Sequence, residues 1–354
     1  YYFGKKDDGS KLVTGQTVAE GEMATGWFYV GKDKYLAKND GSLELDTHDG
    51  GSYRYFFDKT TGTCLFVTGK RENKDYGYSD DSSNDKRIHG FYDHNGKTYY
   101  FGKSGDKLLD GSKLAEGQMA TGWFQVGNDW YRAETDGKLN VGILDWHGGD
   151  KYFFDKTVGK HVFSIKKSED KYYGYGPGKD ATLLHGFYEF DGKKYYFGKK
   201  DDGSGLAEGQ MATGSRMIDG KAHYFNNDGI EEEHEFAGFQ TINGKKYYFG
   251  KKDDGSGLGE GQMATYFVRI NSKLRYFGND GITWGENSWL PDYNQPGEPN
   301  TWYIFGEGEL ATGFQAINGK KYYFGKKDDG SGLGEGQMAT NWFKIGEVQY
   351  AAES

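Results

Sequence analysis

The chain has 354 residues, enough for two ordinary domains or for one long array of small units. Its formal net charge is -9, with 53 acidic and 44 basic residues, which disfavours nucleic acid and anionic membranes as partners. The mean hydropathy is -0.87, yet aromatic residues make up 17% of the chain, whereas disordered segments are poor in aromatic residues.

No run of apolar residues approaches the length of a membrane-spanning helix, so we expect no membrane insertion by this segment. The first residues, Tyr-Tyr-Phe-Gly, are the middle of a repeat and not a signal peptide, which suggests a fragment of a longer protein. Cys64 is the single cysteine, and it therefore excludes an internal disulfide and a cysteine-based metal site.

A 22-residue sequence, GKKYYFGKKDDGSGLGEGQMAT, occupies residues 244–265 and again 319–340, and residues 192–213 differ from it only at Ala207. Its Tyr-Tyr-Phe-Gly mark also starts at Tyr1 and Tyr99. Each mark is followed by a polar loop rich in glycine and aspartate and then by Ala-Thr. Such internal repetition predicts an array of structural units stacked on one another.

Short segments of alternating apolar and polar residues, separated by turn residues such as Asn-Gly or Asp-Gly, predict β-hairpins along the whole chain. In chain order we expect hairpins at residues 27–36, 91–101, 123–132, 187–197, 217–225, 239–249, 267–277 and 313–324. A single hairpin is marginally stable in water, so each must bury its aromatic face against its neighbours. The predicted fold is all-β, an elongated β-solenoid of stacked hairpins.

Two longer units interrupt the short ones, at about 45–89 and about 144–185, and both contain a Leu-Asp-x-His start and a Tyr/Phe-Phe-Asp-Lys-Thr continuation. They divide the chain into module 1 (1–98), module 2 (99–194) and a short-repeat array (195–354). Within the array, residues from about 281 to 305 are diverged and hold three of the four prolines. We predict an irregular excursion from the solenoid there.

The short hairpin motif, as in INGKKYYFG followed by ATG, resembles the cell-wall, choline and glucan-binding repeat superfamily. The alternation of long and short units is most similar to the combined repetitive oligopeptide repeats of large clostridial glucosylating toxins. This resemblance implies a solenoid that bends at the long repeats and binds oligosaccharide where a long repeat meets a short one. It also implies no catalytic role and a secreted, extracellular protein.

Sugar recognition requires a flat apolar face for the pyranose ring and a few fixed polar groups for its hydroxyls. The long-repeat turns, with the tryptophans that follow Ala-Thr-Gly, supply both. The candidate carbohydrate-binding residues are Trp27, Asp46, His48, Asp49, Tyr53, Arg54, Trp123, Asp145, Trp146, His147, Lys151 and Tyr152. The expected partner is an oligosaccharide or polysaccharide on a cell surface, and the alternative is that these residues only pack or solvate the solenoid.

Other functions have weaker support in the sequence. A choline cage would need tryptophan in nearly every repeat, but phenylalanine replaces it at Phe91, Phe187, Phe239 and Phe314. The Asp-Asp-Gly-Ser loops lack the spacing of an EF-hand and are typical of turns, so we expect neither a metal nor a cofactor. We find no catalytic constellation. The remaining alternatives are a glucan- or cell-wall-binding module of an extracellular enzyme and a structural stalk that binds nothing.

Overall fold

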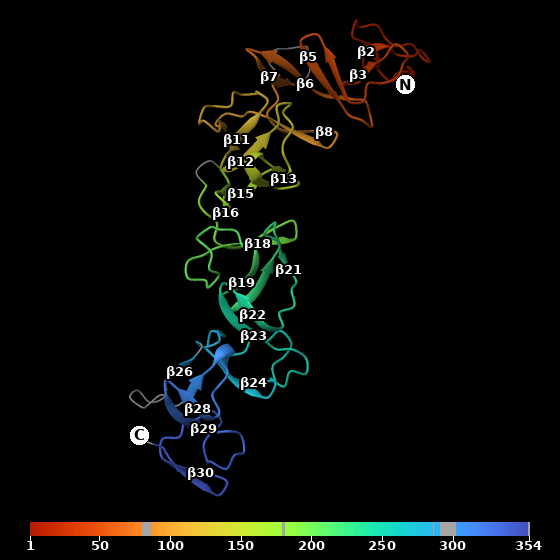
Figure 1. Ribbon diagram of the computed structural model, residues 1–354. Helices are drawn as coiled ribbons and strands as arrows, with labels where there is room; N and C mark the ends of the chain where they lie inside the picture. Colours follow the sequence, from red (N-terminus) through yellow and green to blue (C-terminus); the bar gives the residue numbers. More distant parts are fainter. Residues whose placement is uncertain (80–85, 179–180, 286, 291–301, 353–354) are drawn as a thin grey trace. The chain divides into compact units, whose positions relative to one another are not determined.

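The computed structural model describes residues 1–79, 86–178, 181–285, 287–290 and 302–352, and in these ranges the chain is built almost entirely of short antiparallel β-strands (Figure 1). The only helical segments described are two three-residue 3-10 turns, η1 (His147–Gly149) and η2 (Gly306–Gly308). None of the described helical segments could reach across a membrane. Contacts divide the chain into two compact units, Tyr1–Leu184 and His185–Ser354.

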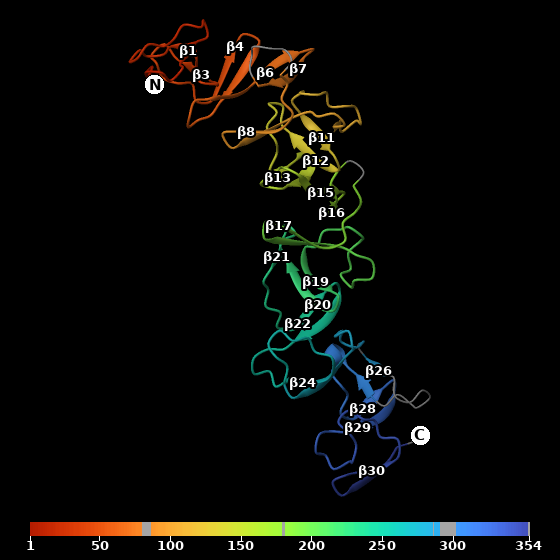
Figure 2. The same ribbon diagram turned by 180° about the vertical axis from the view of Figure 1, so that it is seen from behind.

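Strands of the first unit, drawn from red to green in Figures 1 and 2, are short and mostly paired with their neighbours in sequence. They are β1 (Lys11–Leu12), β2 (Gly26–Val30), β3 (Asp33–Ala37), β4 (Thr47–Gly50), β5 (Tyr53–Phe57), β6 (Cys64–Arg71), β7 (Lys74–Tyr78), β8 (Gly90–His94), β9 (Lys97–Phe101), β10 (Lys107–Leu108), β11 (Gly122–Val126), β12 (Asp129–Ala133), β13 (Gly142–Asp145), β14 (Lys151–Phe154), β15 (His161–Ser168) and β16 (Lys171–Tyr175).

The second unit continues the same pattern of two-stranded and three-stranded sheets. Its strands are β17 (Gly186–Phe190), β18 (Lys193–Phe197), β19 (Gly214–Ile218), β20 (Lys221–Phe225), β21 (Glu231–Glu232), β22 (Gly238–Ile242), β23 (Lys245–Phe249), β24 (Tyr266–Ile270), β25 (Lys273–Phe277), β26 (Ser288–Leu290), β27 (Trp302–Ile304), β28 (Gly313–Ile317), β29 (Lys320–Phe324), β30 (Trp342–Ile345) and β31 (Val348–Ala351).

All eight predicted short hairpins are confirmed. In the last of them β28 pairs with β29 from Gly313 opposite Phe324 to Ile317 opposite Lys320. The turn residues Asn318 and Gly319 both have positive φ, 49° and 79°. Two consecutive residues with positive φ make the turn whose twist matches that of the flanking strands, which is why Asn-Gly recurs there.

Each long repeat forms a four-stranded antiparallel sheet, β4-β5-β6-β7 in the first and β13-β14-β15-β16 in the second. The diverged region at about 281–305 is more regular at its flanks than we predicted, because β26 and β27 pair with Trp289 opposite Tyr303. Its residues 286 and 291–301 lie outside the described part of the chain. The three sequence modules and the elongated, bent course stay predictions.

The hydrophobic core consists of small clusters, each lying between two successive hairpins. In one of them Tyr248 of β23 and Ala264 of the connector pack with Val268, Ile270 and Phe277 of the next hairpin. Similar clusters recur along both units, and every one combines residues from neighbouring repeats. Each hairpin is therefore stabilised mainly by the one before it and the one after it.

A tyrosine–aspartate hydrogen bond closes the acidic loop of each short repeat. The Tyr248 hydroxyl donates to Asp254 Oδ2 at 2.7 Å, and the amides of Lys251 and Ser256 donate to the same carboxylate at 2.7 Å each. Burial alone would raise the pKa of Asp254, but these hydrogen bonds outweigh it and hold the pKa far below its usual range. The same pair recurs at Tyr100–Asp106, Tyr196–Asp202 and Tyr323–Asp329, and at Tyr2–Asp8.

After this loop the chain returns to its own hairpin. The Ala264 amide donates to the Tyr248 carbonyl at 2.8 Å, and Met263 pairs with Phe249. The returning backbone passes so close to Gly250 that a Cβ atom there would lie 2.3 Å from the Gly259 carbonyl oxygen, which only glycine avoids. The repeated 22 residues therefore encode one complete unit: strand, closed loop and return.

We expect Asp254→Asn to loosen this loop, because the amide side chain loses the charge and turns one acceptor into a donor. Amide protection of the loop should fall by about 1–3 kcal/mol of local stability, measured by hydrogen exchange. Tyr248→Phe should cost about 1 kcal/mol and couple to Asp254→Asn in a double-mutant cycle. Asp253→Asn, at the exposed neighbouring position, is the matched control. Equal losses in the two Asn variants would contradict the assignment.

Loop stability should also depend on pH. The pKa of Asp254 and that of Asp329 both lie below the ordinary value of 3.8, so the folded loop binds a proton less readily than the unfolded chain. Their contribution is then fully present above about pH 4 and is lost as the pH falls further. Exchange protection, corrected for intrinsic rates, should be constant from neutral pH to about pH 4 and then decrease. In Asp254→Asn, protection of that loop should lose this dependence.

Candidate functional site

The junction between the first short hairpin and the first long repeat brings predicted residues together. The Trp27 ring of β2 lies 4.5 Å from the ring of Tyr55 and 6.3 Å from that of His48, measured between centroids. Lys34 is only 8% exposed, and its Nζ lies 4.5 Å from the Trp27 ring centroid. Trp27 and His48 therefore lie on one surface, and the ammonium group of Lys34 lies against its aromatic face.

Strand alternation places Asp49 and Arg54 on the opposite face of the sheet, whereas Tyr53 shares the face of Tyr55. Asp49 lies across from Arg54, and the guanidinium holds both carboxylate oxygens, at 2.7 and 3.2 Å. This hydrogen-bonded pair lowers the pKa of Asp49 and lines an open cleft of about 510 Å³ with Tyr53 and Lys70. Asp46 instead accepts a hydrogen bond from Asn95 at 3.3 Å.

The second junction repeats the arrangement of the first. The Trp123 ring packs against Tyr152 at 5.3 Å and against His161 at 5.0 Å, and burial lowers the pKa of His161 to about 4. Trp146, 40% exposed, lies 6.3 Å from Tyr152, and the Arg132 guanidinium lies 4.4 Å from the Trp146 ring. This junction therefore combines uncharged rings, those of Trp123, Tyr152, His161 and Trp146, with the positively charged guanidinium of Arg132.

Hydrogen bonds hold that cation in place. Arg132 donates to Asn140 at 2.6 Å and to Glu134 at 3.0 Å, while Asn140 donates to Glu134 at 2.5 Å. The bond from Asn140, followed by the charge of Arg132, lowers the pKa of Glu134. These three side chains form a fixed polar edge beside the aromatic rings of this junction, a group that the sequence analysis missed.

The remaining predicted residues of the second long repeat do not all join this surface. His147 starts η1 next to Trp146, with 5.7 Å between the ring centroids. Asp145 and Lys151 are opposite each other in the ladder, on the face away from Tyr152. The structure thus separates Lys151 from the tryptophan that was expected beside it.

An aromatic contact of the same kind recurs between short hairpins. In each case the second residue of a hairpin's first strand contacts the second strand of the next hairpin, at 4.5–6.0 Å between ring or guanidinium centres. We call these contacts junction shelves. In the described residues they are Trp27–Tyr55, Phe91–Tyr131, Trp123–Tyr152, Phe187–His223, Phe239–Arg275, Phe267–Trp302, Trp289–Tyr322 and Phe314–Tyr350.

Several shelf phenylalanines are unusually exposed for their type. Phe91, Phe187, Phe267 and Phe314 are between 45% and 56% exposed, although each packs on a tyrosine of its own hairpin. From the sequence, Phe91, Phe187 and Phe314 count only against a choline cage. The signal that identifies them is the fixed position of an aromatic residue directly after the first residue of the hairpin.

The acidic loops offer little to a metal ion. The carboxylate of Asp254 already accepts three hydrogen bonds from Tyr248, Lys251 and Ser256. Within the described ranges no group of three or more His, Cys, Asp or Glu side chains is arranged to hold a metal.

Comparison with known families identifies the repeat. Five segments match the putative cell wall binding repeat, at residues 25–43, 89–107, 121–139, 237–256 and 312–331. Each of them contains a complete hairpin with its shelf aromatic: Trp27, Phe91, Trp123, Phe239 and Phe314. The matches therefore coincide with the structural units described above.

Curated relatives share this region over part of their length. The chain is 30% identical over 191 residues to Glucosyltransferase-S of Streptococcus mutans, covering 53% of this chain and 10% of the relative. It is 25% identical over 315 residues to Glucosyltransferase-I of Streptococcus downei, covering 77% of this chain and 18% of the relative. The chain thus spans less than a fifth of the length of these relatives.

Two solved structures also match this chain. Choline binding protein F of Streptococcus pneumoniae matches at 21% identity and a TM-score of 0.37, covering 82% of this chain and 91% of that one. Alternansucrase in complex with isomaltononaose matches at 24% identity and a TM-score of 0.28, covering 71% and 16%. The clostridial link stays a prediction. Five segments of the chain, together less than a third of its length, match the putative cell wall binding repeat.

Proposed function

We propose that this chain is a non-catalytic module that attaches an extracellular protein to a neutral polysaccharide such as an α-glucan. The observation that carries the proposal is the set of junction shelves, in which an accessible aromatic ring recurs at one position of successive hairpins. The names of the relatives, glucosyltransferases and an alternansucrase seen with isomaltononaose, support the same ligand class.

An aromatic ring that is half exposed can bind the apolar face of a pyranose, whose C–H groups pack on it while its hydroxyls remain available for hydrogen bonds. The two tryptophan junctions supply such polar groups. Beside Trp146 these are Arg132, Glu134 and Asn140, and beside Trp27 they include His48. Each shelf is shallow, so a single contact is weak, and many along one polymer chain raise the apparent affinity.

Choline is the second candidate, and the structure separates the junctions that favour it from those that do not. A quaternary ammonium needs an aromatic face free of other cations. Lys34 lies over Trp27, Arg132 over Trp146 and Arg275 over Phe239. The shelves of Phe91, with Tyr100 and Tyr131, and of Phe314, with Tyr323 and Tyr350, each consist of three aromatic rings, so choline binding would be expected there.

Affinity electrophoresis in gels containing dextran tests the proposal. We expect retardation of the wild-type protein and a roughly two- to tenfold weaker apparent affinity in a Phe91→Ala/Phe187→Ala/Phe314→Ala variant, because each substitution removes one stacking surface. Trp342→Ala is the matched control: Trp342 is 71% exposed and follows Ala-Thr-Asn as Trp27 follows Ala-Thr-Gly, but no described hairpin comes after it to complete a shelf. Thermal melting checks that the variants fold.

Three outcomes would decide against this function. Wild-type migration that dextran leaves unchanged would contradict it, and a chain that binds no glycan but assembles end to end would indicate a structural stalk. Release from dextran by free choline would favour the second candidate, at the shelves of Phe91 and Phe314. Binding only to a host-type oligosaccharide on a glycan array would favour the toxin-like alternative.

A further inference from the structure

A basic cleft lies on the first long repeat, at a place separate from the shelves. Its walls include Tyr53, Tyr78 and the cationic side chains of Lys70, Arg71 and Arg87, and it encloses about 670 Å³. Glu116 also lines this cleft, so it carries three cationic side chains and one carboxylate in a chain whose net charge is -9. All of the lining residues belong to the first compact unit.

The two tyrosine rings of the cleft, those of Tyr53 and Tyr78, pack over Gly69. The rings of Tyr53 and Tyr78 meet nearly perpendicular, at 84° with 6.3 Å between centroids. A Cβ atom at Gly69 would lie 2.7 Å from the Tyr53 ring and 3.4 Å from that of Tyr78. The absence of a side chain at Gly69 therefore lets the two rings settle against the sheet and line the space above it.

Among the cationic side chains of the cleft, that of Arg87 is fixed in place. The Arg87 guanidinium donates to the Glu116 carbonyl oxygen at 3.1 Å and lies 5.0 Å from the Tyr76 ring, so its position is fixed. Among the described residues, no carboxylate lies within ion-pair distance of Lys70, Arg71 or Arg87. Residues 80–85, which include three aspartates, lie outside the described part of the chain.

The second long repeat has the same strands but a different cleft composition. The equivalents of β6 and β7 are β15 and β16, in which Ser168 takes the position of Arg71. The pairing of Tyr78 with Arg87 is replaced by that of Tyr175 with Leu183. Lys166 takes the position of Gly69, and its Nζ lies 5.2 Å from the Tyr175 ring, where it covers the aromatic surface.

We propose that the basic cleft of the first long repeat binds a saccharide that carries a negative charge, as a phosphate or a carboxylate, and that the second long repeat does not. Arg71 and Arg87 would hold the anion, because a guanidinium matches the geometry of both anions with paired N–H donors. Tyr53 and Tyr78 would pack on the sugar ring. The saccharide nature of the ligand rests on the proposed function, whereas its charge follows from the cleft alone.

Affinity electrophoresis distinguishes this site from the shelves. The probes are phosphomannan, polygalacturonate and neutral dextran, each in a separate gel. We expect one or both anionic polymers to retard the wild-type protein. The apparent affinity of the Arg71→Ser/Arg87→Leu variant for these polymers should be lower by a factor of roughly ten or more. The variant copies the residues of the second long repeat, so it should fold, and its retardation by dextran should stay that of the wild type.

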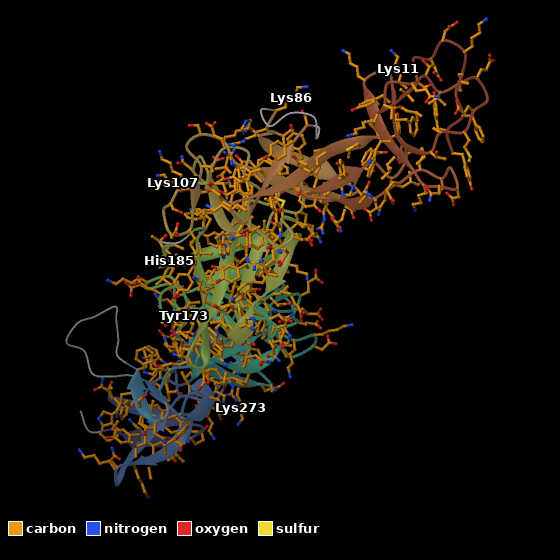
Figure 3. All side chains as sticks on the ribbon, turned by 90° about the horizontal axis from the view of Figure 1, so that it is seen from above. Lys11, Lys86, Lys107, Tyr173, His185 and Lys273 are labelled. Carbon is orange, nitrogen blue, oxygen red and sulfur yellow. The ribbon has the colours of Figure 1, made fainter. Side chains whose placement is uncertain are left out.

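A control with the same change of net charge is Lys11→Ser/Lys107→Ser, which alters two exposed lysines outside the cleft (both labelled in Figure 3). This control should keep its affinity for the anionic polymers. Equal losses in the two double variants would mean general charge attraction and overturn the proposal. So would a wild-type protein that neither anionic polymer retards, whatever dextran does. Loss of dextran retardation alone would count against the shelves and leave this cleft standing.

Discussion

The hydrogen bond between a tyrosine hydroxyl and an aspartate six residues later is the contact on which each Tyr-Tyr-Phe-Gly unit depends. A phenylalanine could fill the same space, but it would not close the loop. The tyrosine ring enters the core between two hairpins, while its hydroxyl emerges at the one place where a carboxylate is already fixed by two amides. Burial of the ring and closure of the loop are thereby stabilised together.

Because that closure is local, the hairpins stack in a constant register, and the constant register makes the shelves. In the eight shelves the second residue of the first strand contacts the next hairpin, whether it is Trp27 or Phe314. The chemical character of each binding surface is then determined by one or two side chains at that junction. Lys34 and Arg132 show how a single basic residue changes the chemistry of an aromatic surface without changing its shape.

Hairpins and turns could be predicted from the sequence because they depend on neighbours in the chain. Asn318-Gly319 permits only a few backbone conformations, and alternation then fixes which side chains are buried. The binding residues were harder, since they depend on which hairpin face meets the next repeat. Lys151 and Trp146 are close in sequence yet lie on different faces, whereas Arg132 and Trp146 are distant in sequence and touch. No local pattern contains that information.

Three nearly identical copies of one 22-residue sequence create a risk during folding, since a strand from one copy fits the partner of another equally well. The six-residue span of the tyrosine–aspartate bond reduces this risk. A tyrosine meets its own aspartate within a loop that closes far faster than distant copies can find each other. Once a repeat has closed its own loop, its tyrosine is no longer available to the aspartate of another copy. Nearly identical copies can therefore fold without exchanging segments.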